Sequence, residues 1–201
     1  QIEDGGGRAL AVQADVSRDR EARQLISKSV GRFGRLDLLI NNAGWTRFIP
    51  HHELDRLSED VLENTWGVIV KGSIFCSRAA VPHLKASPAA SIINITSIAA
   101  YTAQGSSLIY VAAKAALAGI TKALARALAP EIRVNAIAPG FIDTGFVDWT
   151  PDVLEGLQQP TRLGRTIDPE DVADAALYLA ADARATTGQT ILVDAGNAAL
   201  G

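Results

Sequence analysis

Short apolar runs alternate with helical patterns along this chain, and that alternation limits the fold more than any other feature. Continuous apolar runs indicate strands buried on both faces, as in parallel sheets that are covered by helices. Strands are predicted at residues 9–14, 36–40, 90–96, 133–138 and 190–193. Helices are predicted at 18–32, 58–84, 108–129, 151–157 and 168–181. The sequence therefore predicts a single α/β domain with a doubly wound parallel sheet.

Local signals set the expected helix boundaries. Ser17 precedes the first helix and can cap its free N–H groups, and Gly34 can end that helix. One break is expected within 58–84, near Trp66 and Gly67. These signals are local, so they depend on little beyond the neighbouring residues.

Composition argues against several classes of function. The chain has 201 residues and is 48% apolar, enough to bury a core. The net charge is −3 without any basic run, which argues against nucleic-acid binding. No apolar run reaches the ~20 residues of a membrane span. Cys76 is the single cysteine, so a packing role in a reducing, cytoplasmic interior is expected. The histidines His51, His52 and His83 lack metal-ligating company, so no metal site is predicted.

A tyrosine and a lysine four residues apart carry the strongest chemical signal. Tyr110 and Lys114 share one face of the predicted helix 108–129. A cationic amine beside a phenol favours the phenolate and lowers the pKa of the tyrosine. Ser97 follows the predicted strand 90–96, at the edge where open α/β sheets bind their ligands. The three residues together predict a site that moves a proton near neutral pH.

Two other strand ends carry loop motifs. Asn41-Asn42-Ala43-Gly44 follows one strand, where asparagine can bridge strands and glycine allows close approach of a ligand. Pro139-Gly140, with Ile142 and Thr144, follows another and could hold a planar amide. A plain turn explains each motif equally well. Asp15 could accept from an adenine amino group or cap a helix.

Together these motifs resemble, in order and spacing, those of the short-chain dehydrogenase/reductase family. The resemblance spans essentially the whole chain, including Val193-Asp194-Ala195-Gly196, and is greatest to the NAD(P)-dependent subgroup of about 250 residues. It implies a Rossmann-like fold, an NAD or NADP cofactor, and hydride transfer to or from a small secondary alcohol or ketone. It also implies a homotetramer or homodimer, for which the small residues of helix 108–129 offer a close-packing surface.

The resemblance assigns roles to individual residues. Tyr110 would be the general acid/base, Lys114 would lower the tyrosine pKa and hold the nicotinamide ribose, and Ser97 would hydrogen-bond the substrate oxygen. Asp15 and Val16 would contact adenine, and Ile142 and Thr144 the carboxamide. The full cofactor-binding set would be Asp15, Val16, Asn41, Asn42, Ala43, Gly44, Tyr110, Lys114, Pro139, Gly140, Ile142 and Thr144. Apolar residues in the variable substrate loop, among them Phe146 and Trp149, suggest a moderately hydrophobic substrate, although core packing would explain them too.

The chain departs from the family pattern in three places. The family's opening strand and glycine-rich turn are not found, and Gly5-Gly6-Gly7 precedes a predicted strand rather than a helix. Counting back from Asp15, we expect roughly 45–50 residues of the family domain to be missing at the N-terminus, including the residue that selects NAD or NADP. Ile69 stands where an active-site asparagine is usual. Ala113 and Ala195 replace a frequent serine and glycine.

Ile69 leaves a second function open. Isoleucine has no hydrogen-bonding group, so a water-linked proton path through this position would be lost. The alternative to an oxidoreductase is therefore a catalytically impaired or non-catalytic dinucleotide-binding or regulatory module of the same fold. Retention of Ser97, Tyr110 and Lys114 argues for the enzyme.

Overall fold

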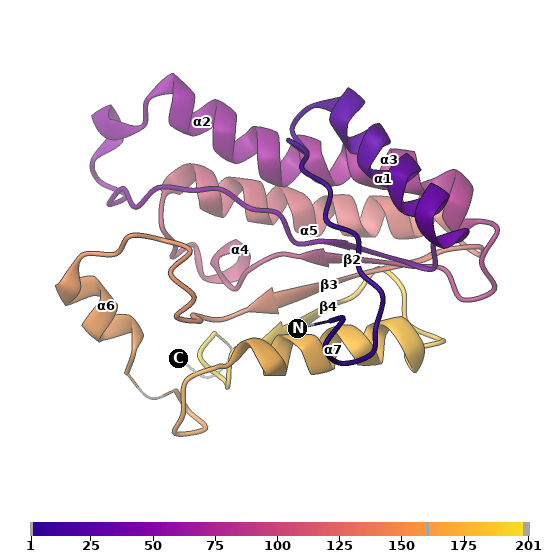
Figure 1. Cartoon of the computed structure of the whole chain (residues 1–201). Helices are drawn as coiled ribbons and strands as arrows, with labels where there is room; N and C mark the ends of the chain where they lie inside the picture. Colours follow the sequence, from indigo (N-terminus) through magenta and orange to yellow (C-terminus); the bar gives the residue numbers. More distant parts are fainter. Residues whose placement is uncertain (1, 160, 199–201) are drawn as a thin grey trace.

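A four-stranded parallel sheet forms the centre of the protein (Figure 1). The computed structural model describes residues 2–159 and 161–198. The strands are β1 (Leu38–Asn41), β2 (Ser91–Ile95), β3 (Arg133–Pro139) and β4 (Thr190–Val193), in the spatial order β1-β2-β3-β4. Their carboxyl ends therefore lie at one edge of the sheet.

Helices cover both faces of this sheet. The other elements are α1 (Asp19–Phe33), the 3-10 turn η1 (Leu54–Arg56), α2 (Glu59–Trp66), the π-helix η2 (Gly67–Lys71), α3 (Gly72–Leu84), α4 (Ala99–Thr102), α5 (Leu108–Leu128), α6 (Pro151–Leu157) and α7 (Pro169–Ala181). Helices α1, α3 and α5 lie on one side and α7 on the other (Figure 1). This confirms the predicted Rossmann-like layers.

Successive side chains of one strand pack into apolar clusters on opposite faces of the sheet. Ile92 packs with Ile26 of α1 and Leu84 of α3, whereas the next residue, Ile93, packs with Leu179 of α7. Successive residues of a strand point to opposite faces, so a strand buried on both sides has to be apolar throughout. The apolar runs in the sequence are explained by this double burial.

The predicted strand at 9–14 is wrong. These residues are irregular and mostly exposed, in the segment that leads to the start of α1 (Figure 1). A strand needs a neighbour to complete its hydrogen bonds, and in the part of the chain described here residues 9–14 pair with none. The sheet accordingly has four described strands rather than five.

Two predicted helix boundaries are corrected as well. Arg18, not Ser17, is the N-cap of α1, because the Ser17 hydroxyl instead donates to Asp15 Oδ1 at 2.7 Å. Near Trp66 and Gly67 the chain does not break but stays helical and widens into η2. Gly67 has ordinary right-handed helical angles, φ −57° and ψ −52°, so nothing interrupts the helix there.

Helix α5 positions most of the site. Ser107 caps it by accepting from the backbone N–H of Tyr110 at 3.3 Å. By length and composition α5 could cross a membrane, with a mean hydropathy of 1.5. In the structure it packs against β3, α2 and α4 and carries the buried Lys114. The core helix of an α/β sheet meets the same length and composition criteria, so this feature is weak evidence for a membrane span.

Candidate active site

Ser97, Tyr110 and Lys114 meet where β2 ends beside α5. The Ser97 side chain lies close enough to the Tyr110 hydroxyl to influence its ionisation. The Lys114 Nζ lies 5.6 Å from the centre of the Tyr110 ring and donates to the Ile95 carbonyl oxygen at 2.7 Å. The structure therefore brings the three predicted residues into one cluster at the carboxyl edge of the sheet.

Burial governs the ionisation of this cluster. Loss of solvent raises the pKa of Tyr110 above its usual range, and the hydrogen bond from Ser97 partly opposes that rise. The expectation that Lys114 lowers the tyrosine pKa is thus not met. Burial also lowers the pKa of Lys114 to about 8. Lys114 is 4% exposed, and its amine is directed to the Ile95 carbonyl.

An apolar cluster closes one side of the site. Ile69 and Val70 of η2 pack against Ala113 and Leu117, the residues that flank Lys114 on α5, and Tyr110 lies against the same cluster. Ile69 is 1% exposed. A π-turn inside a longer helix often marks a functional region, and here it faces the proton-transferring residues.

The Asn41 amide hydrogen-bonds to side chains of neighbouring elements. Its amide Nδ2 donates to Asn94 Oδ1 at 2.8 Å and to Ser77 Oγ at 3.2 Å. Asn94 in turn donates to the Thr121 hydroxyl of α5 at 2.9 Å. The predicted bridging role of an asparagine is confirmed, and the chain through Asn94 and Thr121 is a feature that sequence reasoning missed. Both residues are polar within apolar patterns, which was the available signal.

The other predicted cofactor residues lie on loops at the same edge. Asn42 and Ala43 are exposed, and a Cβ on Gly44 would lie 3.2 Å from the ring of Phe146. At Gly140 a Cβ would lie 2.5 Å from Ile167, so only glycine fits. The Pro139 carbonyl accepts from the N–H of Ile98, which joins this loop to the Ser97 turn. The loop continues with Ile142, which is half-buried, and Thr144, which is exposed.

Asp15 and Val16 occupy a tight turn beside η2 and α3. Asp15 accepts from the Ser17 hydroxyl at 2.7 Å, from the Ser17 N–H at 3.0 Å and from Arg18 Nε at 3.0 Å, and these contacts lower the pKa of its carboxyl. Val16 lies against Gly72, where an added Cβ would be 2.8 Å from Val16 Cγ2. Asp15 therefore stabilises a turn rather than capping α1, whose N-cap is Arg18, and contact of Asp15 and Val16 with adenine stays a prediction.

Aromatic side chains join two loops beside the site. The ring of Trp149 lies 5.2 Å from that of Phe48 and 6.4 Å from that of Phe141, measured between centroids. Phe48 belongs to the loop after β1, and Trp149 to the loop after β3. The apolar character of the loop that follows β3 is therefore at least partly explained by packing.

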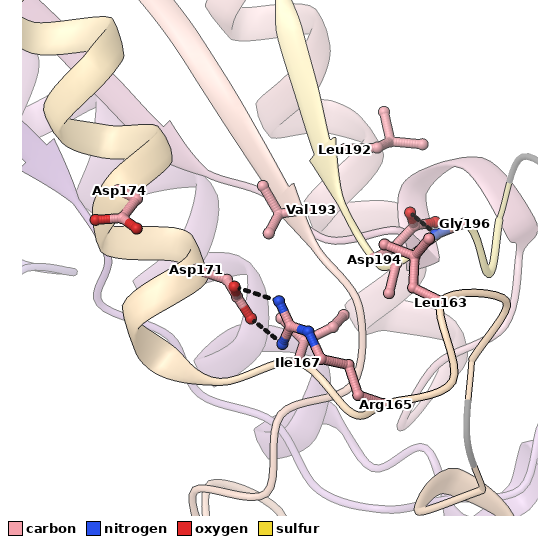
Figure 2. Close-up of a pocket in the computed structure, with 10 residues that line it drawn as sticks. Leu163, Arg165, Ile167, Asp171, Asp174, Leu192, Val193, Asp194 and Gly196 are labelled. Carbon is pink, nitrogen blue, oxygen red and sulfur yellow. Dashed lines mark hydrogen bonds and ion pairs between the residues drawn. The ribbon is translucent and has the colours of Figure 1, made fainter.

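A separate pocket of about 370 Å³ lies between α7 and the end of β4 (Figure 2). Its Arg165 forms a two-pronged ion pair with Asp171, at 2.6 and 2.7 Å. Its buried Asp194 accepts from the backbone N–H groups of Gly196 and Ala198. None of Ser97, Tyr110 and Lys114 lines it. Arg165, Asp171 and Asp194 are already paired within the protein and Asp174 is exposed to solvent, so we place the site at the Ser97 cluster.

No metal centre is evident among the described side chains. Within residues 2–159 and 161–198, no group of three or more His, Cys, Asp or Glu could hold a metal ion. The buried Cys76 has a pKa above its usual range because of burial.

Comparison with known proteins places these features in context. Residues 1–198 match the family model described as enoyl-(acyl carrier protein) reductase. The chain is 43% identical over 191 residues to a protein named as ketoacyl reductase 2 of the granaticin polyketide synthase of Streptomyces violaceoruber, covering 94% of this chain and 76% of that one. It is 36% identical over 199 residues to the 3-oxoacyl-[acyl-carrier-protein] reductase FabG of Staphylococcus aureus, covering 98% and 80%.

Solved structures agree with this match. A short-chain dehydrogenase/reductase structure from Burkholderia xenovorans aligns with a TM-score of 0.87 at 38% identity, over 96% of this chain and 77% of that one. A second, from Brucella melitensis, described as a short-chain dehydrogenase/reductase and glucose/ribitol dehydrogenase, aligns with a TM-score of 0.83 at 30% identity, over 93% and 75%.

Proposed function

Because this chain belongs to the short-chain dehydrogenase/reductase family, we propose that it is an NAD(P)-dependent oxidoreductase that interconverts a secondary alcohol and a ketone. The observation that carries the proposal is the convergence of Ser97, Tyr110 and Lys114 at the carboxyl edge of the sheet. The ketoacyl and oxoacyl reductases among its relatives support a carbonyl substrate.

The three side chains divide the proton chemistry. The Tyr110 hydroxyl donates its proton to the ketone oxygen during reduction and takes it back during oxidation. The Ser97 hydroxyl donates a hydrogen bond to the same oxygen and stabilises the charge that develops there. Lys114, close to the Tyr110 ring, stabilises the phenolate that remains after the proton has moved. Because burial raises its pKa, Tyr110 is protonated at neutral pH and holds the proton that reduction requires.

The surroundings of these residues fit a nicotinamide cofactor, NAD or NADP. The Lys114 ammonium can donate three hydrogen bonds, and among the described residues only the Ile95 carbonyl accepts one. A ribose hydroxyl would satisfy another, and the backbone near Gly140 and Ile142 would hold the carboxamide. When bound, the nicotinamide supplies or accepts the hydride. The described segment has no glycine-rich strand-to-helix turn for a pyrophosphate.

The direct test replaces Tyr110 with phenylalanine. Tyr110→Phe removes the dissociable proton and little volume, so turnover should fall by at least about a thousandfold while the fold persists. The measurement is NAD(P)H absorbance with a panel of ketones and secondary alcohols. The matched control is Tyr178→Phe, which changes an exposed tyrosine on α7 and should retain activity.

Two outcomes would contradict the assignment. Near-normal rates for Tyr110→Phe would remove Tyr110 from the chemistry. Cofactor binding by the unmodified protein without any turnover would support the non-catalytic module instead.

Self-association and location are further parts of the proposal. Helix α5 carries small residues such as Ala112, Ala116 and Gly119, which allow close approach of a second copy, and a dimer or tetramer would use this surface. A cytoplasmic location is proposed on the single, buried Cys76. Light scattering of the purified protein tests the assembly.

A further inference from the structure

The amine of Lys114 is shielded from solvent to an extent that is unusual for a charged group. Its side chain is 4% exposed, and Nζ donates to one carbonyl, that of Ile95. Removing an ammonium group from water disfavours its charged form unless other charges or several hydrogen bonds replace the lost solvent. The side chains that exclude water from around Lys114 therefore affect its protonation directly.

Ile69 of η2 is buried next to the α5 residues that flank Lys114. Ile69 and Val70 form one apolar cluster with Ala113 and Leu117, the neighbours of Lys114 on α5, and Tyr110 packs against this cluster. Ile69 is 1% exposed and offers no hydrogen-bonding group. Ile69 lies within the π-helical turn η2, Gly67–Lys71.

No other charged group accounts for the state of Lys114. The titratable groups on α5 at this level and on the elements that pack against it are Glu59, Asp60, Glu63, Lys71, Tyr101, Tyr110 and Arg133. Of these, only Tyr110 and Arg133 are shielded from solvent, and the Arg133 guanidinium bonds to carbonyls of α7. The pKa of Lys114 is lowered to about 8 by burial, the one cause of the shift.

From these contacts we infer that Ile69 is a positioning residue of the active site: it keeps water from the Lys114 amine, so that Lys114 can release and regain its proton near neutral pH. The inference rests on the proposed function for its link to catalysis. It assigns Ile69 a role in setting the pH dependence of the reaction, through Lys114, without contact with the substrate.

The sharpest test compares Ile69→Thr with Ile69→Val. Threonine and valine have nearly the same shape, so the pair differs by one hydroxyl that can bind water beside Lys114. The protonation of Lys114 is followed by NMR of the protein labelled with carbon-13 at lysine Cε. The sequence has five lysines, and the Lys114→Arg spectrum assigns the signal. The exposed Lys71 and Lys122 serve as internal references.

We expect the titration midpoint of Lys114 to rise by about one pH unit in Ile69→Thr relative to Ile69→Val. The Lys114-dependent limb of the kcat/KM profile should move in the same direction. If the threonine variant does not fold, Ile69→Ala opens the same space to water and should also raise the midpoint relative to Ile69→Val. Equal Lys114 midpoints in Ile69→Val and in Ile69→Thr, or in Ile69→Ala where it replaces the threonine variant, would overturn the inference. A shifted midpoint without turnover by the wild-type protein would instead overturn the proposed function.

Discussion

At the scale of single residues, the buried amine of Lys114 opposes folding at neutral pH. Its pKa is about 8 in the folded protein and about 10.5 in the unfolded chain, so the unfolded chain binds more protons between these values. The contribution of Lys114 to stability should therefore rise as the pH rises from about 8 to about 10.5. Below pH 8 the folded state bears the full cost of burying the charge.

We predict that Lys114→Met stabilises the protein at pH 7 by about 3 kcal/mol, since methionine fills a similar volume without a charge. The advantage over wild type should shrink between pH 8 and 10.5. Urea unfolding at several pH values measures both effects. Lys122→Met, at an exposed position of the same helix, is the control and should change stability little at any pH. A constant difference between Lys114→Met and wild type would show that Lys114 does not titrate as described.

At the scale of elements, one arginine holds the end of α7. Arg133, the first residue of β3, donates from Nη1 to the Leu179 carbonyl at 2.7 Å and from Nη2 to the Ala180 carbonyl at 2.8 Å. The last carbonyls of a helix lack partners within it and carry partial negative charge, so a guanidinium satisfies both needs. Sequence reasoning missed this contact because Arg133 and α7 are distant along the chain.

Arg133→Ala should therefore destabilise the protein by about 2 kcal/mol, because charged hydrogen bonds at a partly buried helix end are lost. Amide hydrogen exchange should increase mainly in the last turn of α7. The exposed Arg184, just beyond the same helix end, gives the control variant Arg184→Ala, for which no such loss is expected. Uniform exchange along α7 in both variants would argue against a capping role.

At the scale of the whole molecule, a polar chain joins the sheet to the helical layer. Asn41 of β1, Asn94 of β2 and Thr121 of α5 are connected by hydrogen bonds, and Asn94 and Thr121 are fully buried. Buried polar groups cost stability when a partner is removed, because the remaining group stays unsatisfied. This chain links layers that apolar packing alone would allow to slide.

We predict that Asn94→Ala lowers the free energy of unfolding by about 3 kcal/mol and Thr121→Val by about 1 kcal/mol. The double variant should lose less than the sum, because both changes break the same Asn94–Thr121 bond. Denaturant unfolding of the four proteins completes the cycle. If the two losses of free energy simply add in the double variant, the Asn94–Thr121 bond contributes no coupling energy to stability.

Much of this architecture was predictable from the sequence, because its signals are local. The strand at 190–193 and the helix at 151–157 have the expected bounds, and the other elements of the sheet differ by one or two residues at their ends. Tyr110 and Lys114 share a helix face as their spacing predicts, and Ser97 follows its strand. Apolar runs and helical spacing act over a few residues, so they can be recognised without knowing what packs against them.

The tertiary structure alone decided what depends on distant neighbours. Residues 9–14 alternate like a strand, yet they remain irregular because they pair with no strand in the described part of the chain. Ala195 adopts a positive φ of 49°, a strained position for a side-chain-bearing residue that its sequence neighbours do not reveal. The pKa of Tyr110 rises because burial removes its hydroxyl from solvent. The sequence by itself determined which groups can carry the chemistry. Long-range packing determined how far these groups are exposed to solvent, and therefore their protonation.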